Sequence, residues 1–468
     1  MMDLQEQMFE ELKEKKIFDQ ARSYAFSYAD GIEEMQVYPS RENLERLAIF
    51  DEAFPDGQTS AENIIHRLHE YGSPATIAQT GGRYYGFVDG GAVPVSIATK
   101  WLSDFWDQCG GLYLTSPINA KLEAICENWL KEIFNLPDET VAGFVSGTSM
   151  ANLSGLAAAR FRLLHNQGWD VNARGLNGAP KIRVIAHAQV HASIKKTLAI
   201  LGLGIETVEW LPSDDQGRLI VDKLPKLDNR CLLLLQAGNA NTGAFDSFAE
   251  VCEKSRKAGA WVHIDGAFGL WAAASKTLAY LTQGMEHASS WSVDGHKTLN
   301  TPYDSGIVLC RDSEALVGAL QTTGEYIIYS DQKDPILYGP EMSKRSRAIE
   351  LWATMKYLGK SGIDKMVTGF HTRAKQLEEG LRNNGYTILN DVVFNQVLVA
   401  CDTEELTKLT LQNIQNSGSV WCGGSTWLEK SVIRISVCSW ATTKKDITTT
   451  IEVFKKAKHE ATHMLSIN

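Results

Sequence analysis

The chain has 468 residues, of which 44% are hydrophobic and 22% charged, proportions that are usual for a globular protein large enough to bury a cofactor. Its formal net charge of -10 argues against a nucleic-acid-binding protein, because such a protein needs a basic face. Without a run of about 18 apolar residues or an apolar N-terminal signal core, we expect no membrane span and a cytoplasmic location.

The first 75 residues are predicted to form a helical arm. Leu4, Met8 and Leu12 recur near helical spacing, and similar apolar positions follow up to residue 68. One interpretation is a solvated amphipathic arm. The other is an arm that packs on a second subunit, because its apolar stripe needs a surface to cover it.

Residues 76–335 are predicted to form a large domain in which strands and helices alternate. The expected strands are short apolar runs separated by helical segments, at 142–146, 182–186, 231–236, 261–265 and 306–310. This alternation is typical of an α/β fold with a largely parallel sheet that helices cover on both faces.

Residues 336–468 are predicted to form a smaller C-terminal α+β domain. A long helical region at about 344–384 precedes a strand at 396–400, a helix at about 404–416, a strand at 432–437 and a final helix from about 444. The polar, proline-bearing segment 331–340 indicates the boundary between the two domains.

Two motifs in the large domain could bind a ligand that carries an anionic group and a positively charged group. Thr148 and Ser149 lie in a turn between a strand and a helix, where free N–H groups and hydroxyls attract an anion such as phosphate. An ordinary helix cap is the alternative. Asp265 ends a buried strand, and its carboxylate needs a positive partner, such as a protonated pyridine nitrogen or, alternatively, loop amides.

Two further residues complete the set. The amine of Lys297 could form an imine with an aldehyde if its surroundings lower its pKa, although a surface lysine has the same sequence pattern. His191 lies between a strand and a helix, where it either stacks on a flat ring or caps the helix. Because a parallel sheet brings its strand ends to one edge, the four motifs together match a phosphorylated pyridine aldehyde.

The motifs resemble those of the group II amino-acid decarboxylases that depend on pyridoxal 5'-phosphate (PLP), which include aromatic-amino-acid and glutamate decarboxylases. The resemblance runs from about Arg83 to Asp446. It includes Ser146-Gly-Thr-Ser-Met-Ala-Asn-Leu153, His263-Ile-Asp-Gly-Ala-Phe-Gly269 and Asp294-Gly-His-Lys-Thr-Leu-Asn300. It implies the PLP-dependent transferase fold type I with a mostly parallel, seven-stranded type of sheet, and a homodimer with the active site near its interface.

The resemblance also implies roles for individual residues. Lys297 would form the internal aldimine, Asp265 would pair with the pyridinium nitrogen, and His191 would stack on the ring. Residues expected around the phosphate are Thr148, Ser149, Asp294 and His296. Residues expected beside the ring are Asn241 and Ala267, and Arg434 matches an arginine that meets the substrate carboxylate in some relatives.

Residues for the substrate are less clearly indicated. Tyr84, Phe87 and Trp106 could line the substrate pocket, or they could serve core or dimer packing. Several relatives use a loop tyrosine as proton donor; here the loop holds Tyr326, Tyr329 and Tyr338, of which we take Tyr338 as the candidate. Thr298 follows the lysine where many relatives have tryptophan. No cysteine or histidine cluster has zinc spacing, so no metal is expected.

The expected function is the PLP-dependent decarboxylation of an L-amino acid to the amine and CO2. The alternative within the same fold is another PLP reaction, by an aminotransferase or a carbon–carbon lyase. A relative that binds a partner without catalysis is a third possibility, although the presence of Lys297, Asp265 and His191 argues against it.

Overall fold

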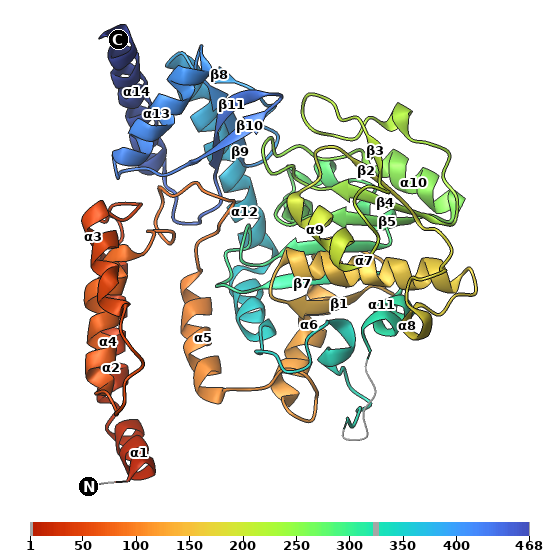
Figure 1. Cartoon of the computed structure of the whole chain (residues 1–468), viewed down its shortest axis with the longest axis horizontal. Coiled ribbons are helices and arrows are strands. Elements are labelled where there is room, and N and C mark those ends of the chain that lie inside the picture. Colours follow the sequence, from red (N-terminus) through yellow and green to blue (C-terminus); the bar gives the residue numbers. More distant parts are fainter. Residues whose placement is uncertain (1–2, 322–326, 468) are drawn as a thin grey trace.

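The computed structural model describes residues 3–321 and 327–467 of the chain. An N-terminal arm, a large sheet with its helices and a small sheet with its helices follow one another in sequence (Figure 1). The arm contains α1 (Leu4–Glu14), α2 (Lys16–Gly31), α3 (Arg41–Glu45) and α4 (Ala61–Arg67). Within the described residues, no helix is long and apolar enough to cross a membrane.

The large sheet has seven strands in the order β1-β7-β6-β5-β4-β2-β3. Strand β7 is antiparallel to both of its neighbours, and the other adjacent pairs are parallel. The strands are β1 (Val141–Val145), β2 (Arg183–His187), β3 (Glu209–Leu211), β4 (Cys231–Gln236), β5 (Trp261–Asp265), β6 (Ser290–Asp294) and β7 (Gly306–Cys310). The predicted α/β fold with a mostly parallel sheet is confirmed.

Helices cover both faces of the large sheet, which explains its apolar strands. In β4, Leu232 and Leu234 pack into one buried cluster, whereas Leu233 and Leu235 pack into another on the opposite face. The first cluster includes residues of α7 (Thr148–His165), α9 (Ala192–Ile200) and α11 (Ser313–Leu320). The second includes residues of α6 (Pro117–Ile133), α10 (Phe248–Ala258) and α12 (Ala348–Asn383).

The small sheet has four antiparallel strands in the order β10-β11-β9-β8. They are β8 (Thr387–Ile388), β9 (Gln396–Ala400), β10 (Gly423–Trp427) and β11 (Lys430–Ser436). Figure 1 shows α12 running between the two sheets, with α13 (Glu404–Asn416) and α14 (Lys444–Ile467) beside the small one. The division into domains at 1–75, 76–335 and 336–468 stays a proposal.

The sequence interpretation missed several elements of this fold. Helices α5 (Pro94–Trp106), α8 (Val171–Arg174) and α11 and strands β3, β6, β8 and β10 were not predicted, although the boundaries of the strands and helices that were predicted for the two domains agree within a few residues. Strand β6 is the most instructive case, because Ser290 and Ser292 are fully buried and their polar side chains have polar partners inside the protein.

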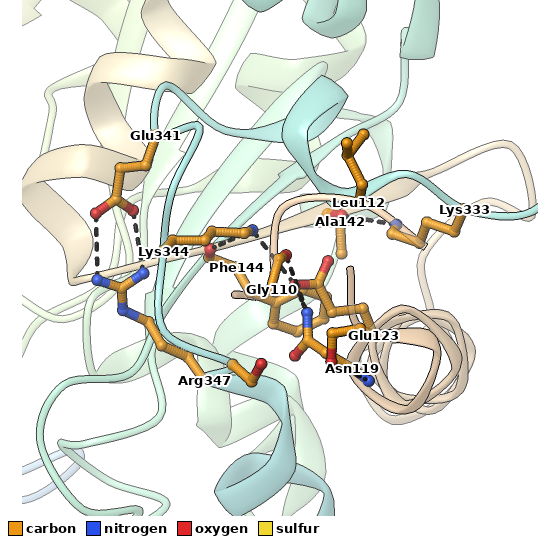
Figure 2. Close-up of polar contacts among 12 residues, drawn as sticks. Gly110, Leu112, Asn119, Glu123, Ala142, Phe144, Lys333, Glu341, Lys344 and Arg347 are labelled. Atoms are coloured by element: carbon orange, nitrogen blue, oxygen red, sulfur yellow. Dashed lines mark hydrogen bonds and ion pairs between the residues drawn. The ribbon is translucent and has the colours of Figure 1, made fainter. Parts of the chain in front are cut away.

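Buried charges attach the segment between α11 and α12 to helix α6 (Figure 2). Lys344 Nζ lies 3.3 Å from Glu123 Oε1, and the two side chains are only 2% and 1% exposed. Lys344 also donates to the Phe144 carbonyl (3.2 Å), and Asn119 Nδ2 donates to Glu123 Oε1 (3.1 Å). Nearby, Lys333 Nζ donates to a carbonyl of β1 (2.9 Å). These contacts fix the segment that precedes α12 against the large sheet.

Candidate active site

A cavity of about 680 Å³ lies at the edge of the large sheet where β1, β4, β5 and β6 end. This edge is where parallel α/β sheets bind ligands. Most of the residues that the sequence singled out line it: Phe87, Thr148, Ser149, His191, Asp265, Ala267, Asp294, His296, Lys297 and Arg434. The structure therefore brings the four predicted motifs to one place.

Lys297 is paired with a carboxylate at the cavity wall. Its Nζ lies 3.2 Å from Asp294 Oδ2, and the Thr148 N–H donates to Asp294 Oδ1 (2.7 Å). Burial by itself raises the pKa of Asp294, but the positive charge of Lys297 and the hydrogen bond from His296 outweigh it and hold this pKa at about 2. Asp294 is therefore ionised at neutral pH and keeps the lysine amine at the start of α7.

The loop that carries Lys297 is fastened by Asn300. The Asn300 N–H donates to the Lys297 carbonyl (3.0 Å), and its Nδ2 donates to the Cys438 carbonyl (2.8 Å). Its Oδ1 accepts from the N–H groups of Gly91 (3.0 Å) and Trp440 (2.9 Å). One buried side chain thus joins the lysine loop to segments of the chain that lie far away in sequence.

The carboxylate of Asp265 is buried at the end of β5 and has two hydrogen-bond donors. Asn152 Nδ2 donates to its Oδ2 (3.1 Å), and the Ala267 N–H donates to its Oδ1 (3.2 Å). Asn152 lies in the motif Ser146–Leu153, but its contact with Asp265 was not predicted from the sequence. Together the two donors fix the position of the carboxylate at the end of β5.

His191 is the N-cap of α9 and borders the cavity. Its Nδ1 accepts from the Ser193 N–H (3.2 Å) and lies 2.8 Å from Ser193 Oγ. Desolvation by the surrounding protein lowers the pKa of His191, the positive charges of Lys297 and Arg434 lower it further, and Asp265 opposes this effect. The imidazole is consequently uncharged at neutral pH and can lie flat against a ring.

The turn before α7 offers an unused donor to a phosphate. Thr148 Oγ1 is buried but has no hydrogen-bond partner among the described residues. The turn is packed closely against the sheet, because a Cβ atom at Gly306 would lie 2.3 Å from Gly147 Cα. With an amine at Lys297 and a carboxylate at Asp265 in the same cavity, these residues fit PLP.

Asp89 is a charged residue of the cavity that the sequence reasoning missed. The Tyr303 hydroxyl donates to Asp89 Oδ1 (2.7 Å), and the Tyr84 hydroxyl donates to Oδ2 (3.5 Å). Burial and the charge of Asp89 raise the pKa of both phenols. Tyr84 does not itself line the cavity, but its hydroxyl helps to hold Asp89 in place.

Arg434 supplies a positive charge on the other side of this part of the cavity. Its Nη1 donates to the Ala240 carbonyl (3.3 Å), and its Cζ lies 6.0 Å from the centre of the Phe87 ring. Burial lowers the pKa of Arg434, and the nearby Asp89 raises it. The Ala240 carbonyl is the one acceptor found for Arg434 in the described part of the chain, so most of its five N–H donors could bind a carboxylate.

The remaining candidates lie outside the cavity. Trp106 is 45% exposed at the end of α5, and the Tyr338 ring centre lies 4.1 Å from Lys333 Nζ beside β1. Asn241 Oδ1 accepts from Ser425 Oγ (2.8 Å), next to a residue that lines the cavity. Tyr326 falls outside the described residues, and Tyr329 does not line the cavity. The assignment of a tyrosine as proton donor stays a prediction.

Comparisons with known proteins agree with the cavity chemistry. A family model described as the pyridoxal-dependent decarboxylase conserved domain matches residues 43–400. An aromatic-L-amino-acid decarboxylase of Bacillus atrophaeus is 26% identical over 430 residues, which cover 87% of either chain. An L-2,4-diaminobutyrate decarboxylase of Rhizobium meliloti (strain 1021) is 27% identical over 319 residues, which cover 64% of this chain and 60% of that one.

The same agreement holds for the fold. The crystal structure of Oryza sativa TDC with PLP and tryptamine superposes with a TM-score of 0.88 at 19% sequence identity, covering 96% of this chain and 98% of that one. The family match spans most of the chain, including every cavity residue that was predicted except Arg434. The chain belongs to the family of pyridoxal-dependent decarboxylases and is a carboxy-lyase that uses PLP to decarboxylate an amino acid.

Proposed function

We propose that this protein converts an L-amino acid into its amine and CO2, and that Lys297 is the residue that holds PLP through the cofactor's aldehyde. The observation that carries the proposal is the shared cavity, in which Lys297, Asp265 and the unpartnered hydroxyl of Thr148 all face one space of about 680 Å³. When bound, PLP supplies a protonated ring that accepts the electron pair left on Cα after CO2 departs.

The residues around the cofactor would divide the work of binding it. Thr148, Ser149 and His296 would hold the phosphate, and Asp265 would keep the proton on the ring nitrogen. His191, uncharged at neutral pH, would stack on the ring, with Ala267 and Asn241 at its border. Asp294 would stay ionised and retain the Lys297 amine within reach.

Arg434 and Asp89 would select the substrate. The available donors of Arg434 suit a carboxylate of the amino acid. Asp89, fixed by the hydroxyls of Tyr303 and Tyr84, would repel an acidic side chain and favour one that donates a hydrogen bond or carries a positive charge. The aromatic-L-amino-acid and L-2,4-diaminobutyrate decarboxylases are 26% and 27% identical to this chain over their matched residues, so percentage identity does not choose between their substrates.

The lysine assignment is tested by replacing Lys297 with alanine. We expect the variant to lose both CO2 release and the visible absorbance of the covalently held cofactor. The matched control is Lys276→Ala, which removes a lysine outside the cavity and should change neither. Visible absorbance and turnover that persist in Lys297→Ala would exclude this lysine.

The reaction itself is tested by analysing products from a panel of common amino acids. Decarboxylation gives CO2 and an amine in equal amounts. A keto acid without CO2 would instead select the aminotransferase alternative, and cleavage at the side chain would select the carbon–carbon lyase. In the same assay, Asp265→Ala should reduce turnover by orders of magnitude while the protein stays folded.

We also propose a cytoplasmic homodimer. The N-terminal arm and α5 meet through ring contacts, with Phe18 and Phe26 against Phe105 and Trp101. Large apolar side chains on these helices remain exposed, including Leu4, Phe9, Leu102 and Phe105. A second copy of the chain would cover this surface, together with Trp106. Light scattering should give twice the chain mass, and a stable, active monomer would contradict the dimer.

A further inference from the structure

Behind Asp265 lies a set of buried polar side chains that the proposed reaction does not use directly. Asn152 of α7, His263 of β5, and Ser290 and Ser292 of β6 have no exposed surface. Buried polar groups are costly unless each has a hydrogen-bond partner. These four satisfy one another, and Asn152 connects them to Asp265.

The direction of the first hydrogen bond fixes the tautomer of His263. Trp261 Nε1–H donates to Ser290 Oγ (3.0 Å), and an indole nitrogen has no other role available. Within the described part of the chain, His263 Nδ1 at 2.8 Å is the one acceptor found for the proton of the Ser290 hydroxyl, so the hydroxyl donates there. The imidazole therefore carries its proton on Nε2. Burial lowers the pKa of His263 to about 3, so the ring is uncharged at neutral pH.

The tautomer of His263 in turn orients the amide of Asn152. His263 Nε2–H donates to Asn152 Oδ1 (2.9 Å), and the Ser292 hydroxyl donates to the same oxygen (2.6 Å). Two donors at one atom require it to be the oxygen, so the NH2 group must point the other way. There it donates to Asp265 Oδ2 (3.1 Å), with Ser193 Oγ at 3.4 Å. If the amide were flipped, its NH2 group would face the two donors, His263 Nε2–H and the Ser292 hydroxyl, and its oxygen would face the carboxylate of Asp265.

The helix makes room for this arrangement at Gly155. A Cβ atom at Gly155 would lie 2.8 Å from Cε1 and 2.9 Å from Nδ1 of His263. Glycine within a helix is unfavourable compared with alanine, and the adjoining imidazole accounts for it here. Helix α7 thus carries both the amide that contacts Asp265 and the gap that admits His263.

We propose that Asn152 is a positioning residue whose amide, oriented by His263 and Ser292, holds the carboxylate of Asp265 in place for the protonated ring nitrogen of the cofactor. This inference rests on the proposed pairing of Asp265 with that nitrogen. Among the described residues Asp265 has two hydrogen-bond donors, and Asn152 supplies the one that comes from a side chain.

The tautomer is measured without cofactor. In protein labelled with 15N-histidine, NMR assigns the His263 signal by its loss in His263→Gln and reports which nitrogen is protonated. We expect an uncharged ring with its proton on Nε2. A proton on Nδ1 would overturn the inference, because His263 could then not donate to Asn152.

The effect on the ring nitrogen is measured in protein reconstituted with PLP labelled by 15N in the ring. Asn152→Leu removes the donor to Asp265, His263→Leu removes a donor to Asn152, and His263→Gln keeps an N–H group in its place. We expect a protonated ring nitrogen in wild type and in His263→Gln. Asn152→Leu and His263→Leu should lose that protonation and bind PLP about tenfold more weakly, as for loss of one hydrogen bond to a charged group.

Asp265→Asn separates the two proposals. If it leaves the ring nitrogen protonated, the proposed pairing with Asp265 fails. If it removes protonation while the folded Asn152→Leu and His263→Leu variants behave as wild type, only the positioning role fails. If either leucine variant does not fold, the positioning role is still tested by the tautomer of His263 and by the protonation of the ring nitrogen in His263→Gln compared with wild type.

Discussion

Replacing Lys344 with methionine should destabilise the protein strongly. The change removes the only cation within 4 Å of Glu123 among the described residues, and it leaves a carboxylate that is almost fully buried. Glu123 Oε1 would keep the donor from Asn119, but its Oε2 already has no partner in the part of the chain that the structure describes. Methionine retains most of the length and volume of lysine, so the loss of charge dominates.

The expected cost is about 3–5 kcal/mol, the usual effect of removing one partner from a buried ion pair. The double variant Glu123→Gln/Lys344→Met removes both charges and should regain most of that loss. Lys360→Met is the matched control, because it breaks an ion pair between α12 and the same helix α6, and both side chains of that pair are exposed. Its expected cost is below about 1 kcal/mol.

The assay compares the thermal unfolding of wild type and the three variants without cofactor and at one protein concentration, since ligands and self-association both shift the apparent stability. The melting temperatures should fall in the order wild type, Lys360→Met, the double variant, and Lys344→Met lowest. A melting temperature of Lys344→Met equal to that of Lys360→Met, or one of the double variant below that of Lys344→Met, would show that the buried ion pair does not stabilise the protein in this way.

Three further predictions follow from the cavity and its surroundings. In the unfolded chain His263 is protonated below about pH 6.5, but in the folded protein it is protonated only near pH 3. The free energy of unfolding therefore falls as the pH drops from about 6.5 to about 3. In His263→Gln the melting temperature should depend less on pH in this range. Gly155→Ala should melt below wild type despite the better helix propensity of alanine, because its Cβ would meet the His263 ring. Asp89→Asn should raise kcat/KM for amino acids with acidic side chains relative to cationic ones, and an unchanged ratio in the substrate panel would contradict the role of Asp89.

The parts of the fold that the sequence predicted well are those buried on both faces. Strands β4, β5 and β7 were located to the residue, because continuous apolar runs admit few other interpretations. Strand β6 was missed because its serines resemble a loop. Their partners, Asn152 and His263, come from distant parts of the chain, so no local pattern reveals that a polar face is buried.

The candidate site shows the same limit. Asp265 ends a predicted strand and Thr148 follows another, so the geometry of a parallel sheet was enough to predict that they meet. Lys297 follows β6, which was not predicted, so its place in the cavity was expected from the motif around it. Asp89 follows no strand of the large sheet and belongs to no recognised motif, and only the folded chain places it in the cavity. Trp106 and Tyr338 were proposed from their residue types, and in the described chain both lie elsewhere.

The contacts of Asn300 have a consequence for the order in which the protein is assembled. Its side chain holds the loop of Lys297 by bonding to Cys438 and Trp440, which leave the ribosome long after the lysine itself. We therefore expect nascent chains that end before these residues to form the large sheet while their reactive amine lacks its final anchorage. Maturation of the enzyme would then wait until the chain has been translated as far as Trp440.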